Sequence, residues 1–320
     1  MVSINKRGAL EIIISVLPGI VFAWLTGRDY YLIASFFAVC ALIPYNKSYF
    51  NRYYPFIHLV LIFGIGELMA NALQSGEYWR YFMIMGAVGL LSGYLEFNNP
   101  SLRKAASWIM IGVIYSSFKF PHIPASQYTA ANLISILLLA AVSLALALLV
   151  NKPKLSHISY KFKFSSRDCL LYFRIVFPVL IAFVVWRIFD IQEAEWLLWS
   201  SISVANIELE AAKTKAKHRL LGGAAGIIVG FAVALILPVS QLLNYLLFTC
   251  MMLTFRVFDK YYIAFTTRCF FIVLYANNHF MIGCTRITNV LIGAVIGYLC
   301  SLVLVRFQQR YEKNYKMKGQ

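Results

Sequence analysis

Long apolar runs, each ended by a short polar or basic stretch, repeat along the whole chain. Their lengths of roughly 16–22 residues match what a helix needs to cross about 30 Å of hydrocarbon. The runs lack the alternation of barrel strands, so helices are the structure that satisfies their backbone in lipid. The pattern predicts an all-α integral membrane protein with about twelve transmembrane helices, near residues 9–27, 30–45, 56–74, 79–95, 104–117, 129–150, 169–187, 195–208, 220–238, 241–258, 261–276 and 282–305.

A polar, basic stretch in the middle of the chain is too short to form a domain and predicts a cytoplasmic linker. The predicted organisation is a first six-helix repeat (1–150), the linker (151–168), a second six-helix repeat (169–305) and a basic cytoplasmic tail (306–320).

The two halves resemble each other most where residues 30–39 align with residues 196–205. Because each copy has an even number of spans, both copies have the same orientation and are parallel repeats. We expect the substrate path near the axis that relates them.

The charge distribution predicts the orientation in the membrane. The chain has 29 Lys and Arg against 13 Asp and Glu, and most of these cations fall on the face that carries both termini. This bias predicts a bacterial inner membrane protein with both termini in the cytoplasm, and it requires no nucleic-acid partner. The opposite face holds only Arg28, Arg80, Lys119, Arg187 and Arg286.

Enzymatic chemistry finds no support in the sequence. There is no GxSxG, HExxH, P-loop or dinucleotide motif. The six cysteines lie in or near apolar runs without a CxxC pair, and the five histidines lack metal-ligand spacing. We therefore expect no catalytic residue, metal or cofactor.

Two features have a structural interpretation. Gly222, Gly226 and Gly230 lie on one helical face, as do Gly293 and Gly297, and predict seams where helices pack closely. Aromatic residues are 16% of the chain, and those at predicted helix ends, such as Trp196 and Trp199, are interpreted as an interfacial belt.

The chain also resembles a known family. A Glu-Trp-Leu-Leu-Trp sequence at 195–199 precedes a charged stretch, then Arg-Leu-Leu-Gly at 219–222 with the spaced glycines. This arrangement resembles fusaric acid resistance membrane proteins, a group that includes aromatic carboxylic acid exporters and is distantly similar to aluminium-activated malate channels. Gly223 stands where that family usually has threonine. The resemblance implies proton-driven export of organic anions.

Basic residues in or beside the spans are the candidate substrate-binding groups. Arg174 and Arg268 fall inside predicted spans, where an arginine costs roughly 2.5–3.5 kcal/mol on insertion scales. Each is expected to bind an anion, to form a structural ion pair, or to extend its charged end to a nearby membrane interface. Arg52 and Arg219 lie at the cytoplasmic ends of spans and are expected to collect the anion.

Glu67 is the most isolated acid in an apolar run and is the candidate for proton coupling. The alternative is that it pairs with one of the arginines. Asn71 lies one turn further along the same face, and either binds substrate or bridges helices.

The favoured function is a secondary exporter of organic anions such as aromatic carboxylates, acting as a monomer or homodimer. Two alternatives are a passive anion channel and a membrane assembly subunit that transports nothing.

Overall fold

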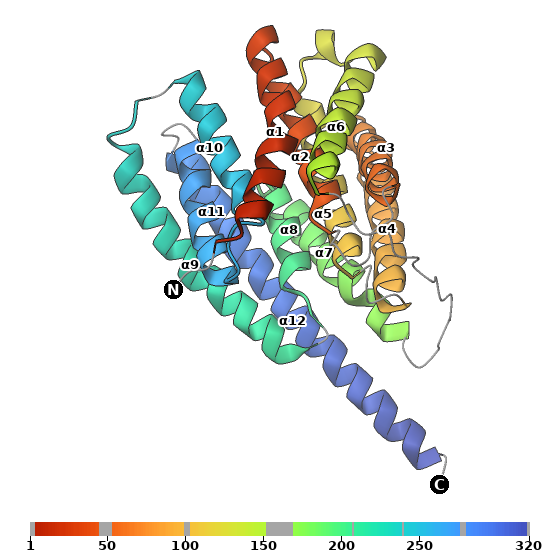
Figure 1. The fold of residues 1–320 in the computed structure, drawn as a ribbon. Coiled ribbons are helices and arrows are strands. Elements are labelled where there is room, and N and C mark those ends of the chain that lie inside the picture. The colour runs from red at the N-terminus through yellow and green to blue at the C-terminus, as the bar shows by residue number, and fades with distance from the viewer. Residues whose placement is uncertain are drawn as a thin grey trace.

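The computed structural model describes residues 4–44, 53–98, 103–151, 169–206, 208–238, 240–275 and 280–318, and these residues contain helices but no strand. The all-α prediction is therefore confirmed for the described part of the chain. Its α-helices are α1 (Lys6–Thr26), α2 (Leu32–Leu42), α3 (Tyr54–Gln74), α4 (Tyr78–Asn98), α5 (Arg103–Lys119), α6 (Ala130–Asn151), α7 (Cys169–Phe189), α8 (Glu195–Val204), α9 (Leu209–Ala234), α10 (Gln241–Leu253), α11 (Tyr261–Tyr275) and α12 (Phe280–Lys318) (Figure 1).

Six helices of the described part are long and apolar enough to cross a membrane: α1, α3, α6, α7, α9 and α12. The outward face of α6 carries exposed Ile134, Leu138, Val142, Leu146 and Leu149. An apolar stripe of this length suits lipid rather than water. Each of the twelve predicted spans coincides with a helix, but twelve membrane crossings remain a prediction because the other helices are shorter or more polar.

The helix bounds correct the sequence analysis at two charged segments. α9 begins at Leu209 and not near residue 220, so the charged stretch before Arg219 is part of the helix. α12 continues through the predicted tail as far as Lys318 and leaves the body of the bundle (Figure 1). Both segments are rich in Ala, Lys, Arg, Glu and Gln and contain no Pro, so their helix propensity is high although they are polar. Arg52 and residues 152–168, nearly the whole predicted linker, lie outside the described residues.

Helix α2 is the centre of the bundle, since every residue from Leu32 to Leu42 is buried. It contacts α1, α3, α5 and α6, while α3 packs on α5. In the second half α8 contacts α7, α9 and α12, and α9 packs on α11. The halves also join where α4 packs on α7, where α10 packs on α1 and where α5 packs on α8.

The glycines of α9 lie against α11. A Cβ at Gly226 would overlap the carbonyl oxygen of Thr266, and one at Gly230 would be 3.0 Å from the Cβ of Val273. Gly293 and Gly297 of α12 face α8 in the same way, where a Cβ would overlap the carbonyl oxygens of Leu197 and Ser201. These helices approach so closely that no side chain fits between their backbones.

The variant Gly226→Leu is expected to lower the free energy of unfolding by about 3 kcal/mol or more, because the new side chain forces α9 away from α11. Gly64→Leu is the matched control, since a Cβ at Gly64 meets no atom within 4 Å. Thermal-unfolding midpoints and monodisperse yields in detergent measure both. Equal stability of the two variants would contradict the close seam.

Candidate functional site

A cavity of about 630 Å³ lies at one end of the bundle, and we call it the basic cavity. It lies between the end of α2, the first turns of α5, α7 and α11, the end of α8, the first half of α9 and the turn after α10. Basic side chains dominate its polar lining, with one acid, Asp259, among them. The basic residues that line it are Arg174, Lys215, Arg219, Arg256 and Arg268.

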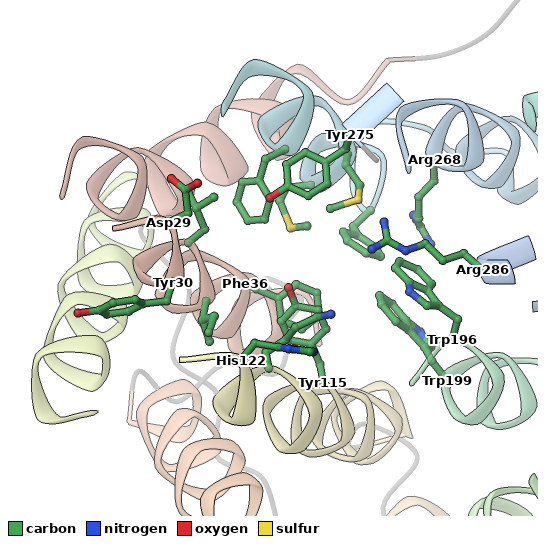
Figure 2. A pocket seen from close by; sticks show the side chains of 17 residues that line it. Asp29, Tyr30, Phe36, Tyr115, His122, Trp196, Trp199, Arg268, Tyr275 and Arg286 are labelled. Carbon is green, nitrogen blue, oxygen red and sulfur yellow. The ribbon is translucent and has the colours of Figure 1, made fainter. Parts of the chain in front are cut away.

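A second cavity of about 310 Å³ lies at the opposite end of the bundle, and we call it the aromatic cavity (Figure 2). It lies among the start of α2, the end of α5, the start of α8 and the end of α11. Its walls are mainly aromatic. They include Phe36, Tyr115, Trp196, Trp199, Phe248, Phe255 and Tyr275.

The two cavities share Trp199, Phe255 and Arg268 in their linings. The rings of Trp199 and Phe255 are stacked, with centroids 5.8 Å apart and planes 16° from parallel. The guanidinium carbon of Arg268 lies 3.8 Å from the Phe255 centroid, a cation–π geometry. These three side chains, which we call the partition, lie where the basic and the aromatic cavity meet.

Arg268 is held by neutral groups in the turn after α10. Its Nε donates to the Thr254 hydroxyl at 2.9 Å, and one terminal nitrogen donates to the Thr254 carbonyl oxygen at 3.3 Å. Among the described residues it forms no ion pair. Its positive charge therefore faces both cavities without a carboxylate to neutralise it.

Arg219 is also held by neutral groups, although only 3% of its surface is exposed. Its three nitrogens donate to the hydroxyls of Tyr261 at 2.8 Å, Ser200 at 2.5 Å and Ser203 at 2.7 Å. No ion pair to it is found in the described part of the chain. A guanidinium fixed by hydroxyls keeps its charge available to an anion in the basic cavity.

Arg174 differs from these two because it forms a buried ion pair with Glu96 at the end of α4. It also donates to the carbonyl oxygen of Ala205 at 2.7 Å. The structural ion pair that the sequence left open as an alternative is therefore present. Where α1 meets α10, Glu11 of α1 pairs with Arg256 after α10 at 2.8 Å, so in both ion pairs the first half supplies the carboxylate.

The aromatic cavity also has paired cations at its rim. Lys119 Nζ lies 2.7 Å from a carboxylate oxygen of Glu195, and Arg286 Nε lies 2.8 Å from one of Glu193. Glu193 lies in the turn between α7 and α8. Burial alone would raise the pKa of the Glu193 carboxyl, but the neighbouring Arg286 lowers that pKa overall.

The comparison with protein families adds an independent observation. Residues 180–300 match the family described as fusaric acid resistance protein-like. This part of the chain is fusaric acid resistance protein-like. The resemblance drawn from the sequence is thereby confirmed, while the similarity to malate channels stays an expectation. No curated protein and no solved structure matches the chain.

The fusaric acid resistance protein-like region contains Arg219, Arg268 and both partition rings. Together with the apolar helices, the match supports an integral membrane protein, and the matched family is one of membrane transporters. The first half of the chain, with Glu67, lies outside the match.

Glu67 and Asn71 are brought together, but away from both cavities. Asn71 Nδ2 donates to a carboxylate oxygen of Glu67 at 2.6 Å, within α3. Neither residue lines the basic or the aromatic cavity. No ion pair joins Glu67 to an arginine in the part of the chain that the structure describes.

The groups that hold the arginines were not predicted from the sequence, and two aromatic residues were misassigned to the interfacial belt, since Trp196 and Trp199 stack on each other in the wall of the aromatic cavity. Trp199 is 8% exposed and forms the partition, so it is not part of an interfacial belt. The Glu-Trp-Leu-Leu-Trp sequence that contains Trp199 could have indicated that this residue belongs to the candidate site. Thr254, Ser200 and Ser203 offered none, because a hydroxyl in an apolar run usually bonds to its own helix.

The variant Glu96→Gln is expected to lower the free energy of unfolding by about 3 kcal/mol, because it leaves the buried charge of Arg174 uncompensated. Glu77→Gln is the control, directly before the same helix, since the Glu77–Arg80 pair is solvent-exposed and contributes under about 1 kcal/mol. Thermal unfolding in detergent measures both. If Arg174 binds substrate instead, releasing it from Glu96 will lower the half-saturating substrate concentration with little change in stability.

Proposed function

We propose that the chain is a secondary exporter of organic anions that binds its substrate in the basic cavity. The observation that carries this proposal is the difference among the buried arginines. Arg174 and Arg256 have carboxylate partners, whereas Arg219 and Arg268 have neutral ones. Two uncompensated guanidiniums facing one cavity favour an anionic ligand.

The lining of the basic cavity suits an organic anion more than an inorganic one. Each guanidinium offers a planar set of donors that matches a carboxylate. Beside Arg268 the cavity wall is apolar and aromatic, with Trp108, Trp199 and Phe255. A ligand with a carboxylate and an apolar, planar body satisfies both parts of the wall, which supports aromatic carboxylates as substrates.

The arrangement of the helices supports the two-repeat architecture. The six long apolar helices are the first, third and sixth of each half. In each half the third helix packs on the fifth, α3 on α5 and α9 on α11. The cavities lie between equivalent helices, α2 and α5 of one half and α8 and α11 of the other. One chain thus surrounds the whole path, which favours a monomer as the working unit over an obligate homodimer.

The same architecture supports export from the cytoplasm. The basic cavity lies at the end of the bundle that carries the lysines of α9, among them Lys215. The charge bias predicts that this end faces the cytoplasm. Arg28, Arg80, Lys119, Arg187 and Arg286 all lie at the other end. We propose a bacterial inner membrane location with both termini cytoplasmic.

Replacing either uncompensated arginine tests the binding site. Arg268→Ala and Arg219→Ala are each expected to weaken substrate binding by about 10- to 100-fold, the equivalent of one lost charge-assisted hydrogen-bonding group. Flux of labelled benzoate and of labelled aliphatic carboxylates into proteoliposomes, with and without a pH gradient, measures the effect.

Arg268→Lys keeps the positive charge and should recover part of the binding, which separates loss of charge from loss of the guanidinium. Arg80 lies outside both cavities, so Arg80→Ala should leave binding unchanged. Normal flux in a well-folded Arg268→Ala variant would contradict the anion site. Flux that follows voltage and ignores the pH gradient would establish the channel instead. The assembly subunit would show no flux and a stably co-purified partner.

Proton coupling through Glu67 is a separate part of the proposal. α3 packs on α5, which lines both cavities, so a change in the charge of Glu67 can reach the path through that contact. Glu67→Gln is expected to abolish the dependence of flux on the pH gradient while the half-saturating substrate concentration stays within about twofold. Unchanged gradient dependence in this variant would exclude Glu67 as the coupling acid.

A further inference from the structure

The two cavities open at opposite ends of the helix bundle. α5 begins beside the basic cavity, which Ser107 lines, and ends beside the aromatic cavity at Lys119. α8 runs the other way, from Trp196 in the aromatic cavity to Ser203 in the basic one. The two cavities therefore follow one another along the bundle and meet at the residues that line both of them.

A continuous column of flat groups lies where the cavities meet. The rings of Trp196 and Trp199 are stacked 5.5 Å apart at 14°, and Phe255 follows at 5.8 Å. Arg268 covers the Phe255 end of the column, and Arg286 lies 5.7 Å from the Trp196 ring at the other end. Two members of this column, Trp199 and Phe255, line both cavities, so the column lies where the cavities meet.

The charges of the aromatic cavity indicate what it binds. Lys119 and Arg286 are neutralised by Glu195 and Glu193, so Arg268 is the lining cation without a carboxylate partner in the described residues. Asp29 lies on the side of the cavity opposite Arg268 and Arg286, where it accepts a hydrogen bond from Tyr245 (Figure 2). The cavity thus presents one available positive charge, aromatic walls and a negative charge at its far side.

We propose that the aromatic cavity is a second binding site for the transported organic anion, closed off from the basic cavity by Trp199 and Phe255, with Arg268 serving both sites. This inference rests on the proposed function. An anion crosses when the two partition rings separate, and its carboxylate keeps the same guanidinium partner on both sides. The aromatic column then faces the apolar body of the ligand in the second site.

The position of Asp29 limits the ligand to a single negative charge. A monocarboxylate places its one charge at Arg268 and its apolar body along the rings. A second carboxylate at the far end of the ligand would approach Asp29 and be repelled. The second site therefore selects monocarboxylates over linear dicarboxylates of similar length.

The reactivity of introduced thiols tests the partition without any need for transport. Met251→Cys lies in the aromatic cavity alone and Ser107→Cys in the basic cavity alone. Each is made in a background with the native cysteines replaced by alanine, after its folding has been checked against the parent chain. A negatively charged, membrane-impermeant methanethiosulfonate is then added to right-side-out and to inside-out vesicles.

We expect the Met251→Cys thiol to react from one face only and the Ser107→Cys thiol from the other face only. Trp199→Ala should make the Ser107→Cys thiol reactive from both faces, roughly tenfold faster from the face that was closed. Trp79→Ala is the matched control, since Trp79 is 71% exposed on α4. Reaction of both thiols from the same face, or no effect of Trp199→Ala, would overturn the partition.

Protection experiments test the ligand. Benzoate is expected to slow modification of the Met251→Cys thiol in a saturable way, while succinate and sodium chloride at equal ionic strength do not. Arg268→Ala should abolish the protection, and Asp29→Asn should let succinate protect. Absence of benzoate protection would overturn the second site. Sidedness of the thiols is independent of flux, so this inference and the proposed function fail separately.

Discussion

A guanidinium inside a helix bundle must be neutralised by a carboxylate, or held by neutral groups with its charge available to a ligand. The basic cavity contains both cases. Arg174 and Arg256 are neutralised by Glu96 and Glu11, and these two ion pairs join the halves of the chain. Arg219 and Arg268 are held by neutral groups, so the same type of side chain stabilises the framework in one place and, in the proposed function, binds the anion in another.

The framework that holds these charges depends on close backbone packing. α9 reaches α11 only because Gly226 has no side chain, and this contact brings Arg219 of α9 to Tyr261 of α11. The close packing of α12 on α8 brings Val290 beside Ser200, which accepts a hydrogen bond from Arg219. The Ser200 hydroxyl in turn donates to the carbonyl oxygen of Val290 at 2.6 Å. The small residues therefore act on the site indirectly, by fixing which polar groups can reach each arginine.

The helices were largely predictable, because apolar runs and their polar ends are local properties of the chain. Errors arose where helix propensity and hydrophobicity disagree, as in the charged start of α9. The candidate site was predictable only as a set of arginines. Whether Arg174 had a partner depended on Glu96, which is distant in sequence, and Glu67 looked central although α3 places it beside Asn71 and away from the cavities.

The sequence by itself determined the class of protein, the order of the helices and the family resemblance of residues 180–300, since these depend on composition and on motifs within one helix or loop. Only the tertiary structure decided which arginines keep an available charge and that Trp199 lies where the two cavities meet. The physical reason is that charge compensation and ring stacking are set by neighbours from other helices, and no pattern along one helix encodes those neighbours.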